Sequence, residues 1–474
     1  MRDNTFILPD HAQEGKRAKS VERSQFMLDE DALDLGKGKT YFIRTYGCAA
    51  NVRDGETIAG LLEAMGFQRA ADEKSADVLI FNTCAVRGTS EEHVFGEIGT
   101  LKPWKQQHPE KILALCGCMA QEESVVEAIL KTYRQVDLVF GTHNLDALPR
   151  LLAKAMRGEK AIEVKSEQGG IVEDLPVNRS SVIKGFVNIA YGCDKFCTYC
   201  IVPYTRGKER SRLMPYILDE IRQFEQRGGK EVMLLGQNVN SWGKDLGIED
   251  GFTKLLIAAA QTGIRRIRFD SSHPRDYSET TIDAMRDYEN IMPSLHLAVQ
   301  SGSDTVLQRM NRGYTIEHYK ELFDTMKAKI PSMTFSTDLI VGFPQESDEE
   351  FQKTLDLVDY CRFDQVYSFI YSPREGTPAA AMEDDVPRHV KEERLQELNR
   401  HINHWAYENN QNYLNRTLEV LCEGPSKKRT DVLAGYSREF KLVNFTGRNV
   451  KAGDIVQVKI TGAKSFSLDG VAIE

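Results

Sequence analysis

The sequence contains no long apolar run and no excess of positive charge. No segment reaches about 18 consecutive apolar residues, the length that a membrane-spanning helix needs. The N-terminal residues are charged and lack the apolar core of a secretory signal. The formal net charge of -9 argues against a protein that coats nucleic acid by bulk charge, although a local basic site is compatible with it. We therefore expect a cytoplasmic protein without a membrane segment.

The nine cysteines lack the regular spacing of a small disulfide-rich secreted protein. Their odd number and irregular placement favour a reducing compartment, and metal or redox use rather than disulfides. The chain of 474 residues is long enough for about three domains. The cysteines are therefore the first place to look for chemistry.

Three cysteines are spaced C-x-x-x-C-x-x-C, at Cys193, Cys197 and Cys200. Three thiolates cannot complete a four-ligand zinc site, but they can hold three irons of a 4Fe-4S cluster and leave the fourth iron open. An apolar strand is predicted at 185–190, which places the triplet on a loop at the strand's C-terminal end. The alternatives are a zinc knuckle completed from elsewhere, a thioredoxin-like Cys-x-x-Cys, and free core cysteines. Thiolate softness and the placement favour the cluster.

Strand and helix patterns alternate four times before this loop. Such alternation predicts a doubly wound parallel sheet covered by helices, with ligands bound outside the C-terminal ends of the strands. The expected strands are 41–46, 78–82, 112–115 and 136–140, and the expected helices are 54–65, 91–104, 121–132 and 145–156.

Cysteines stand at or just past three of these strand ends. They are Cys48, Cys84 and the pair Cys116 and Cys118. Because neighbouring strands are about 5 Å apart, loops from three of them could gather three thiolates around one cluster. Residues two apart in a strand share a face, so spacing leaves open which member of the pair is the ligand. The position of Cys118 closer to the loop favours it.

The rest of the chain is predicted to form a second α/β domain and a small terminal barrel. Six further strands with helical connections, over 183–411, suit a central partial (β/α)6 barrel of TIM-like design, whose working face is the C-terminal one. Residues 412–474 read as a small all-β barrel. We expect 1–38 to be a disordered leader, 39–156 to be the first domain and 157–182 to be a linker.

The last segment is locally basic. From Gln411 to the end there are ten Lys/Arg and seven Asp/Glu. A basic patch at Lys427, Lys428, Arg429 and Arg438 fits contact with an RNA backbone, whereas the alternative is a solvated turn.

Several sequence words resemble the radical S-adenosylmethionine methylthiotransferases, and within them the MiaB-type enzymes that act on tRNA. The match covers the chain from about residue 38 to its end. Its words are YGCDKFCTYCIVPYTRGKE at 191–209, LGQNVNSW at 235–242, QSGS at 300–303, MNRGYT at 310–315, YSPREGTPA at 371–379, TYGCAAN at 45–51, NTCAVR at 82–87 and GCMAQ at 117–121. The last word points to Cys118 rather than Cys116. The sequence departs from relatives at Gln345 and Ser347, where Gly and Thr are frequent, and at Ala298, where Pro is usual.

The resemblance implies two 4Fe-4S clusters. One, on Cys193, Cys197 and Cys200, would bind S-adenosylmethionine through its open iron and yield a 5′-deoxyadenosyl radical. The other, on Cys48, Cys84 and Cys118, would carry the sulfur, which a second S-adenosylmethionine methylates. No catalytic residue is expected beyond these ligands. Positions at strand ends suggest that Gln237, Asn238, Gln300 and Asp338 contact S-adenosylmethionine.

The implied substrate is a tRNA whose isopentenylated adenosine, beside the anticodon, receives a methylthio group at carbon 2. The terminal barrel resembles a TRAM domain that would grip the tRNA. A reducing electron donor is implied, and we expect a monomer. The alternatives are a sister enzyme acting on threonylcarbamoyladenosine of tRNA, a branch that modifies an aspartate of a ribosomal protein, and a non-catalytic iron-sulfur RNA-binding protein.

Overall fold

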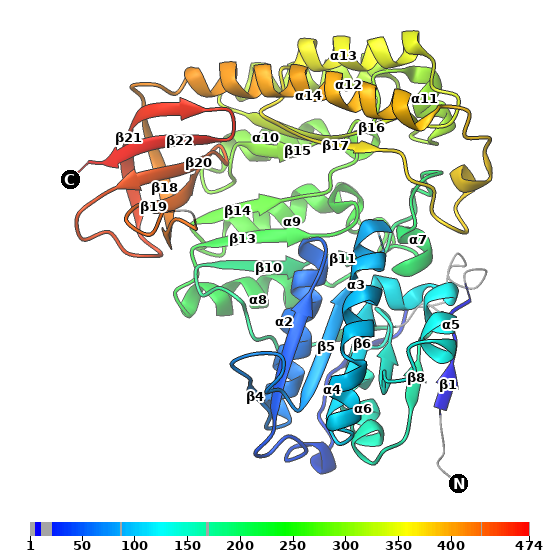
Figure 1. Cartoon of the computed structure of the whole chain (residues 1–474). Coiled ribbons are helices and arrows are strands. Elements are labelled where there is room, and N and C mark those ends of the chain that lie inside the picture. The colour runs from blue at the N-terminus through cyan, green and yellow to red at the C-terminus, as the bar shows by residue number, and fades with distance from the viewer. Residues whose placement is uncertain (1–4, 11–20, 86–87, 167–169, 428, 474) are drawn as a thin grey trace. The chain divides into compact units, whose positions relative to one another are not determined.

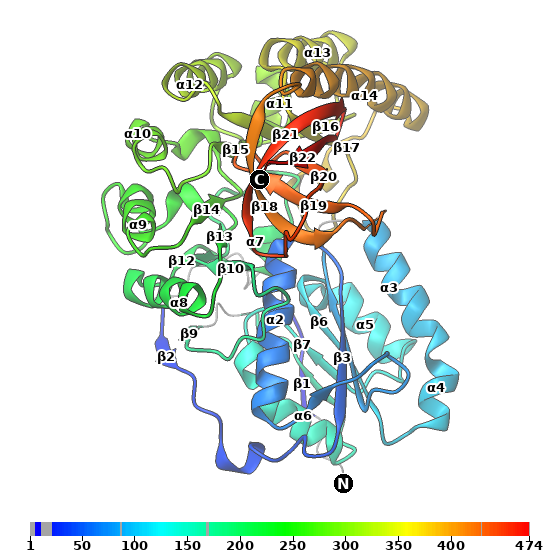
Figure 2. The same cartoon turned by 90° about the vertical axis from the view of Figure 1, so that its left-hand side faces the viewer.

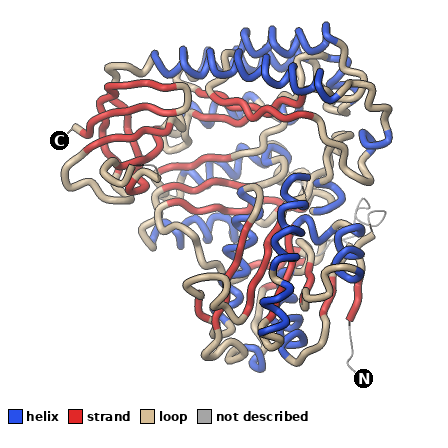
Figure 3. Tube along the Cα trace, in the orientation of Figure 1, coloured by secondary structure: helices blue, strands red, loops and turns tan. Residues whose placement is uncertain are grey.

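The computed structural model describes residues 5–10, 21–85, 88–166, 170–427 and 429–473. The chain divides into two compact units. Unit 1 comprises Met1–Ser180, Asn188–Phe196 and Cys200–Tyr216, and unit 2 comprises Ser181–Val187, Cys197–Tyr199 and Ile217–Glu474. Strands and helices alternate along much of both units (Figure 3). Within the described residues, no helix is long and apolar enough to cross a membrane.

Unit 1 contains a seven-stranded sheet in which every pairing is parallel. Its strands are β1 (Thr5–Ile7), β3 (Thr40–Thr45), β4 (Gln68–Arg69), β5 (Val78–Thr83), β6 (Ile112–Gly117), β7 (Leu138–Phe140) and β8 (Ala161–Glu163). Their order in the sheet is β1-β8-β7-β6-β5-β3-β4 (Figure 1). Every residue of β5, β6 and β7 is buried, as central strands covered on both faces require.

Helices cover both faces of this sheet. The helices are α2 (Ala49–Ala64), α3 (Gly88–Thr100), α4 (Lys102–Gln107), α5 (Glu123–Lys131) and α6 (Leu148–Met156). Alternate side chains of a strand point to opposite faces. Val78 and Ile80 of β5 accordingly join a core with α2 and α6, whereas Leu79 and Phe81 join a core with α3 and α5. The prediction of a doubly wound parallel-sheet domain is confirmed.

Two segments that were expected to lie outside the domains belong to this unit. β1 is the edge strand beside β8, and β2 (Arg23–Gln25) pairs in parallel with β9 (Ile171–Glu173). For the described residues, the predictions of a disordered leader over 1–38 and of a linker over 157–182 are therefore wrong. β8 is fully buried, but three-residue strands surrounded by charges leave little periodicity to detect. Residues 1–4, 11–20 and 167–169 lie outside the described part.

A short antiparallel hairpin frames the cysteine triplet. β11 (Ala190–Tyr191) pairs with β12 (Arg210–Ser211), and α7 (Val202–Thr205) lies between them along the chain. This stretch packs on the sheet of unit 1, because Thr142 Oγ1 donates to the Thr205 carbonyl at 2.6 Å. Residues that follow the triplet in sequence thus become neighbours of the first domain.

Unit 2 begins with six strands in two three-stranded sheets, β10-β13-β14 and β15-β16-β17. Two isolated parallel bridges, Ile267 with Ile291 and Ser272 with Leu297, continue the pairing from β14 toward β15. The strands are β10 (Lys184–Asn188), β13 (Glu231–Leu235), β14 (Arg266–Phe269), β15 (Ser294–His296), β16 (Thr334–Val341) and β17 (Gln365–Ile370). The connecting helices are α8 (Met214–Gln226), α9 (Gly251–Ala260), α10 (Glu279–Asp287), α11 (Asp304–Arg309), α12 (Ile316–Lys329) and α13 (Asp348–Cys361). The partial (β/α)6 barrel is confirmed.

A long helix leads from this barrel to a small closed barrel of five strands. The helix is α14 (Arg388–Gln411), and it packs against α13 and β17 (Figure 2). The barrel has the order β18-β19-β20-β22-β21, and its strands are β18 (Thr417–Pro425), β19 (Leu433–Ser437), β20 (Leu442–Thr446), β21 (Ile455–Lys464) and β22 (Ser467–Ala472). The predicted all-β terminal barrel is confirmed.

Two buried arginines of β14 bind the small barrel to the rest of unit 2. Arg266 donates to the Tyr436 carbonyl at 2.9 Å and pairs with Glu419 at 2.7 Å. Arg268 donates to the Ser437 carbonyl at 2.8 Å and pairs with Glu231 at 3.0 Å. The small barrel is therefore a packed part of unit 2 rather than a module on a loose tether.

Replacing one of these arginines should destabilise unit 2. We expect Arg268→Met to lower the free energy of unfolding by about 3 kcal/mol, because it leaves Glu231 and the barrel carbonyls with fewer donors in a buried site. Urea-induced unfolding followed by circular dichroism measures the change. Arg286→Met is the matched control, since Arg286 forms an exposed pair with Asp283 and should change stability by no more than about 0.5 kcal/mol. Equal stability of the two variants would contradict the assignment.

Candidate functional site

Three strands of unit 1 deliver the three predicted cysteines to one place. Cys48 follows β3 and caps α2, Cys84 follows β5, and Cys118 follows β6. The Asn51 Oδ1 atom lies 3.4 Å from Cys48 Sγ and 3.8 Å from Cys118 Sγ, and Asn51 also donates to the Thr83 carbonyl beside Cys84 at 2.7 Å. Cys48 is exposed, whereas the other two are buried. The three thiols are therefore candidate ligands of one metal cluster, and only Cys48 is exposed to solvent.

The structure separates Cys116 from Cys118. Cys116 is the last but one residue of β6 and lies inside the apolar core that contains Leu138 and Phe140. Gly117 has a φ of 91°, a left-handed conformation that favours glycine and ends the regular strand. Cys118 therefore does not continue the alternation of β6, and it packs instead beside Ala85 and Ile201.

A buried arginine contacts the Cys118 thiol. Arg206 Nε lies 3.1 Å from Cys118 Sγ, and Arg206 Nη2 forms an ion pair with Asp54 at 2.7 Å. Burial raises the pKa of Cys118 to about 12, Arg206 lowers it, and the neighbouring Cys84 and Cys48 raise it. The shared contact with Asn51 Oδ1 places the Cys48 and Cys118 thiols near each other. Sequence reasoning quoted Arg206 within a family word but assigned it no role.

The loop with the second cysteine set is held in a tight turn. Gly192 has a φ of 73°, and a Cβ built on it would lie 2.4 Å from the Gly207 carbonyl oxygen and 2.2 Å from that of Lys208. Only glycine fits this position. The Cys193 N–H donates to the Gly207 carbonyl at 3.0 Å. Cys193 and Cys200 are both partly exposed, as ligands of a reactive cluster would be.

The middle cysteine of this loop packs within unit 2. Cys197 is buried, and Arg312 Nη1 lies 3.4 Å from its Sγ. Arg312 Nη2 donates to the Ala298 carbonyl, just after β15, at 2.6 Å. The Thr198 N–H donates to the Met310 carbonyl at 3.1 Å. Cys197 and Thr198, which belong to unit 2, are therefore held close to the C-terminal end of β15.

No three His, Cys, Asp or Glu side chains within the described ranges converge closely enough to hold one metal ion. In a 4Fe-4S cluster each thiolate binds a different iron, so the cluster needs a wider donor set than a single ion. Two sets of three cysteines, each with a buried cationic neighbour, fit the anionic thiolate clusters by the chemistry of their donors.

Two of the four predicted cofactor contacts are neighbours. Gln300 has a φ of 75°, and its N–H donates to the Asp338 carbonyl at 2.9 Å. The Asp338 Oδ2 atom lies 3.3 Å from His296 Nε2. This contact contributes to a raised pKa of His296, although burial opposes it.

The other two predicted contacts follow β13. Gln237 is half-buried and Asn238 is buried. Asn238 Nδ2 donates to Asp276 at 2.7 Å, and no described residue donates to its buried Oδ1. Contact with S-adenosylmethionine stays a prediction for all four residues.

Sequence reasoning missed Asn240, in the same LGQNVNSW word. Asn240 is buried, and neither its Nδ2 nor its Oδ1 has a partner among the described residues. The Ser272 hydroxyl, after β14, is also buried and has no hydrogen-bond partner among the described residues. Buried polar groups are nearly always paired, so these atoms fit a rim that receives a polar ligand. The signal that could have found Asn240 is its place in the sequence, two residues after the predicted contact Asn238.

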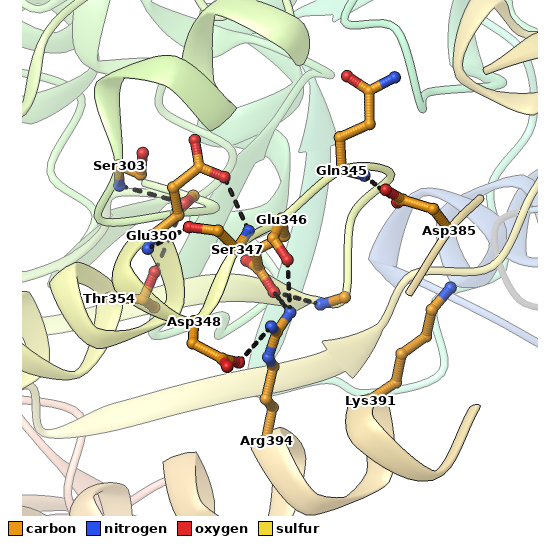
Figure 4. A network of polar contacts seen from close by, with 12 residues as sticks. Ser303, Gln345, Glu346, Ser347, Asp348, Glu350, Thr354, Asp385, Lys391 and Arg394 are labelled. Carbon is orange, nitrogen blue, oxygen red and sulfur yellow. Dashed lines mark hydrogen bonds and ion pairs between the residues drawn. The ribbon is translucent and has the colours of Figure 1, made fainter. Parts of the chain in front are cut away.

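The loop after β16 contains a buried carboxyl group (Figure 4). Glu346 accepts a hydrogen bond from the Gly342 N–H at 2.7 Å and pairs with Arg394 at 3.0 Å. Burial raises the pKa of Glu346 to about 7, although these two donors oppose the rise. Gln345, where relatives often have glycine, has a φ of 65°, the conformation that favours glycine. Ser347 forms a capping box with Glu350 at the start of α13.

The basic patch of the terminal barrel is partly neutralised. Arg429 pairs with Asp431 at 3.0 Å, and Arg438 pairs with Glu289 at 3.4 Å. Lys427 is exposed, and Lys428 lies outside the described residues. Both arginines of the expected basic patch therefore have an acidic partner.

Known families match three parts of the chain. The radical SAM superfamily matches residues 187–358, the uncharacterized protein family UPF0004 matches residues 40–141, and the TRAM domain matches residues 411–473. A tRNA-2-methylthio-N(6)-dimethylallyladenosine synthase of Shouchella clausii is 50% identical over 474 residues, which cover 99% of this chain and 91% of the relative. One of Staphylococcus aureus is 48% identical over 476 residues, which cover 100% of this chain and 93% of the relative.

The chain belongs to this synthase family. Its fold also resembles that of a radical S-adenosylmethionine methyltransferase, TsrM of Kitasatospora setae, with a TM-score of 0.54 at 13% identity; the match covers 72% of this chain and 77% of the other. The radical SAM domain of this synthase family member implies S-adenosylmethionine and a 4Fe-4S cluster.

The pKa of Glu346 predicts a pH dependence of stability. A carboxyl group whose pKa is higher in the folded chain than its ordinary value of 4.5 contributes stability below about pH 4.5, and loses it as the pH rises through about 7. We expect Glu346→Gln to lose less stability than the unmodified chain between about pH 5 and about pH 8. Thermal unfolding across this range measures the difference. Glu349→Gln, an exposed change at the start of the same helix, is the control and should follow the unmodified chain.

Proposed function

We propose that this chain is a tRNA methylthiotransferase that adds a methylthio group to carbon 2 of N6-isopentenyladenosine beside the anticodon. The observation that carries the proposal is the presence of two separate sets of three cysteines, each with a buried arginine, in a chain about half identical to the named synthases. One set alone would support radical chemistry without a source of sulfur.

Cys193, Cys197 and Cys200 would hold one 4Fe-4S cluster, and Cys48, Cys84 and Cys118 would hold the second. When bound, the two clusters and S-adenosylmethionine supply hydrogen abstraction and the sulfur that is transferred. Gln300 and Asp338 lie after β15 and in β16, on the side of unit 2 to which Arg312 connects Cys197. This placement supports S-adenosylmethionine contact at Gln300 and Asp338, and the unpaired Asn238 Oδ1 supports a contact after β13.

The substrate would be bound by the terminal barrel. An exposed aromatic ring, Phe466, stands at the turn between β21 and β22, near Lys459 in the sequence and near Lys464, which pairs with Asp469 at 2.8 Å. Aromatic faces stack on unpaired bases, and lysines contact phosphates. We further propose that the chain acts as a cytoplasmic monomer supplied by a reducing electron donor.

Nucleoside mass analysis tests the reaction. In cells that lack this chain, tRNA should lose the methylthio-isopentenyl nucleoside and accumulate the isopentenyl nucleoside, and a plasmid copy should reverse both changes. Copies with Cys193→Ala or Cys84→Ala should fail to do so, because each removes a cluster ligand. Loss of methylthio groups from threonylcarbamoyladenosine instead would assign the sister activity, and unchanged tRNA would refute the proposal.

Iron analysis tests which cysteines are ligands. The anaerobically reconstituted chain should contain about eight irons, two clusters of four. Cys118→Ala should retain about four, whereas the matched variant Cys116→Ala should retain about eight, because Cys116 lies in the apolar core. If instead Cys116→Ala retained about four irons and Cys118→Ala about eight, Cys116 would be the ligand.

A further inference from the structure

Each cysteine set contains one buried sulfur that accepts a hydrogen bond from a buried arginine. In unit 1 the donor is Arg206 and the acceptor is Cys118, at 3.1 Å. In unit 2 the donor is Arg312 and the acceptor is Cys197, at 3.4 Å. The two arginines are 6% and 5% exposed. The same contact thus occurs in both units, built from unrelated elements.

The surroundings of the two arginines differ in one respect. Arg206 is paired with Asp54 at 2.7 Å, so its charge is partly compensated. Arg312 contacts the Ala298 carbonyl and the Tyr314 hydroxyl, and no carboxylate of the described residues pairs with it. A buried cation without a counter-charge is costly. An anionic cluster bound through Cys197 would supply that charge.

We propose that Arg206 and Arg312 are positioning residues, each of which holds one cluster-binding thiolate and raises the reduction potential of its own cluster. The inference rests on the proposed function, because it requires both clusters. Reduction adds negative charge to a cluster, and hydrogen bonds to its sulfurs stabilise the reduced form. A buried cation acts in the same direction, and the low local dielectric strengthens both effects. Each arginine should therefore act on one cluster only.

Redox titration monitored by electron paramagnetic resonance measures the effect on the reconstituted full chain. Changing Cys193, Cys197 and Cys200 together to Ala isolates the cluster on Cys48, Cys84 and Cys118 as the first background. Changing Cys48, Cys84 and Cys118 together isolates the cluster on Cys193, Cys197 and Cys200 as the second. Arg206→Met should lower the midpoint potential in the first background and leave it unchanged in the second. Arg312→Met should do the reverse. Methionine retains most of the apolar stem and removes the charge and the donors.

Asp54→Asn provides a test by sign. It removes a negative charge beside Arg206, so it should raise the midpoint potential of the cluster in the first background, opposite to the effect of Arg206→Met. If the two substitutions acted only by damaging the structure, they would shift the midpoint potential in the same direction. Arg206→Lys should restore part of the potential, because it restores the charge. Arg212→Met is the matched control, since Arg212 is buried in the same segment and pairs with Glu173.

The outcomes separate this inference from the proposed function. A chain that binds only about four irons in total would refute the proposed function. A chain that binds about eight irons, but in which Arg206→Met shifts both clusters equally or neither of them, would overturn the arginine assignment alone. If Arg206→Met prevents cluster binding in the first background, the sign of the Asp54→Asn shift decides: an upward shift supports the assignment, and any other result overturns it.

Discussion

Parallel strands send their carboxyl ends to one edge of a sheet, and both units of this chain depend on that constraint. In unit 1, β3, β5 and β6 end at Cys48, Cys84 and Cys118, which are distant in sequence but meet around Asn51. In unit 2, the segments after β15 receive Arg312, which contacts Cys197. The candidate ligand side chains therefore gather at the carboxyl ends of the strands, where parallel sheets bind their ligands.

The cost of burying charge shapes what surrounds these cysteines. Arg206 and Arg312 are both taken out of water, and each donates to a sulfur. Elsewhere buried arginines satisfy backbone instead: Arg268 donates to barrel carbonyls and pairs with Glu231. The same residue type thus connects domains at one site and contacts a candidate metal ligand at another. Its partners decide which role it has.

Much of the fold could be predicted from local pattern. The doubly wound sheet, the six-stranded partial barrel and the terminal barrel all have elements long enough to display their periodicity, and β5 and β6 begin at the expected residues, Val78 and Ile112. The three-residue strands β1, β8 and β9 could not be predicted this way, because burial of so short a segment is decided by neighbours that are distant in sequence. The same limit applies to the basic patch, where Asp431 and Glu289 pair with the arginines.

The sequence by itself determined the candidate ligands, because cysteine spacing and strand ends are local properties. It also determined the resemblance to a family, which the relatives confirmed. The sequence already favoured Cys118 over Cys116, but only the tertiary structure gave the physical reason, since the turn at Gly117 directs the Cys118 sulfur toward Arg206 and leaves Cys116 in the core. Only the tertiary structure showed Asn240 as buried and unpaired. Such contacts join residues that are far apart along the chain, and periodicity carries no information about them.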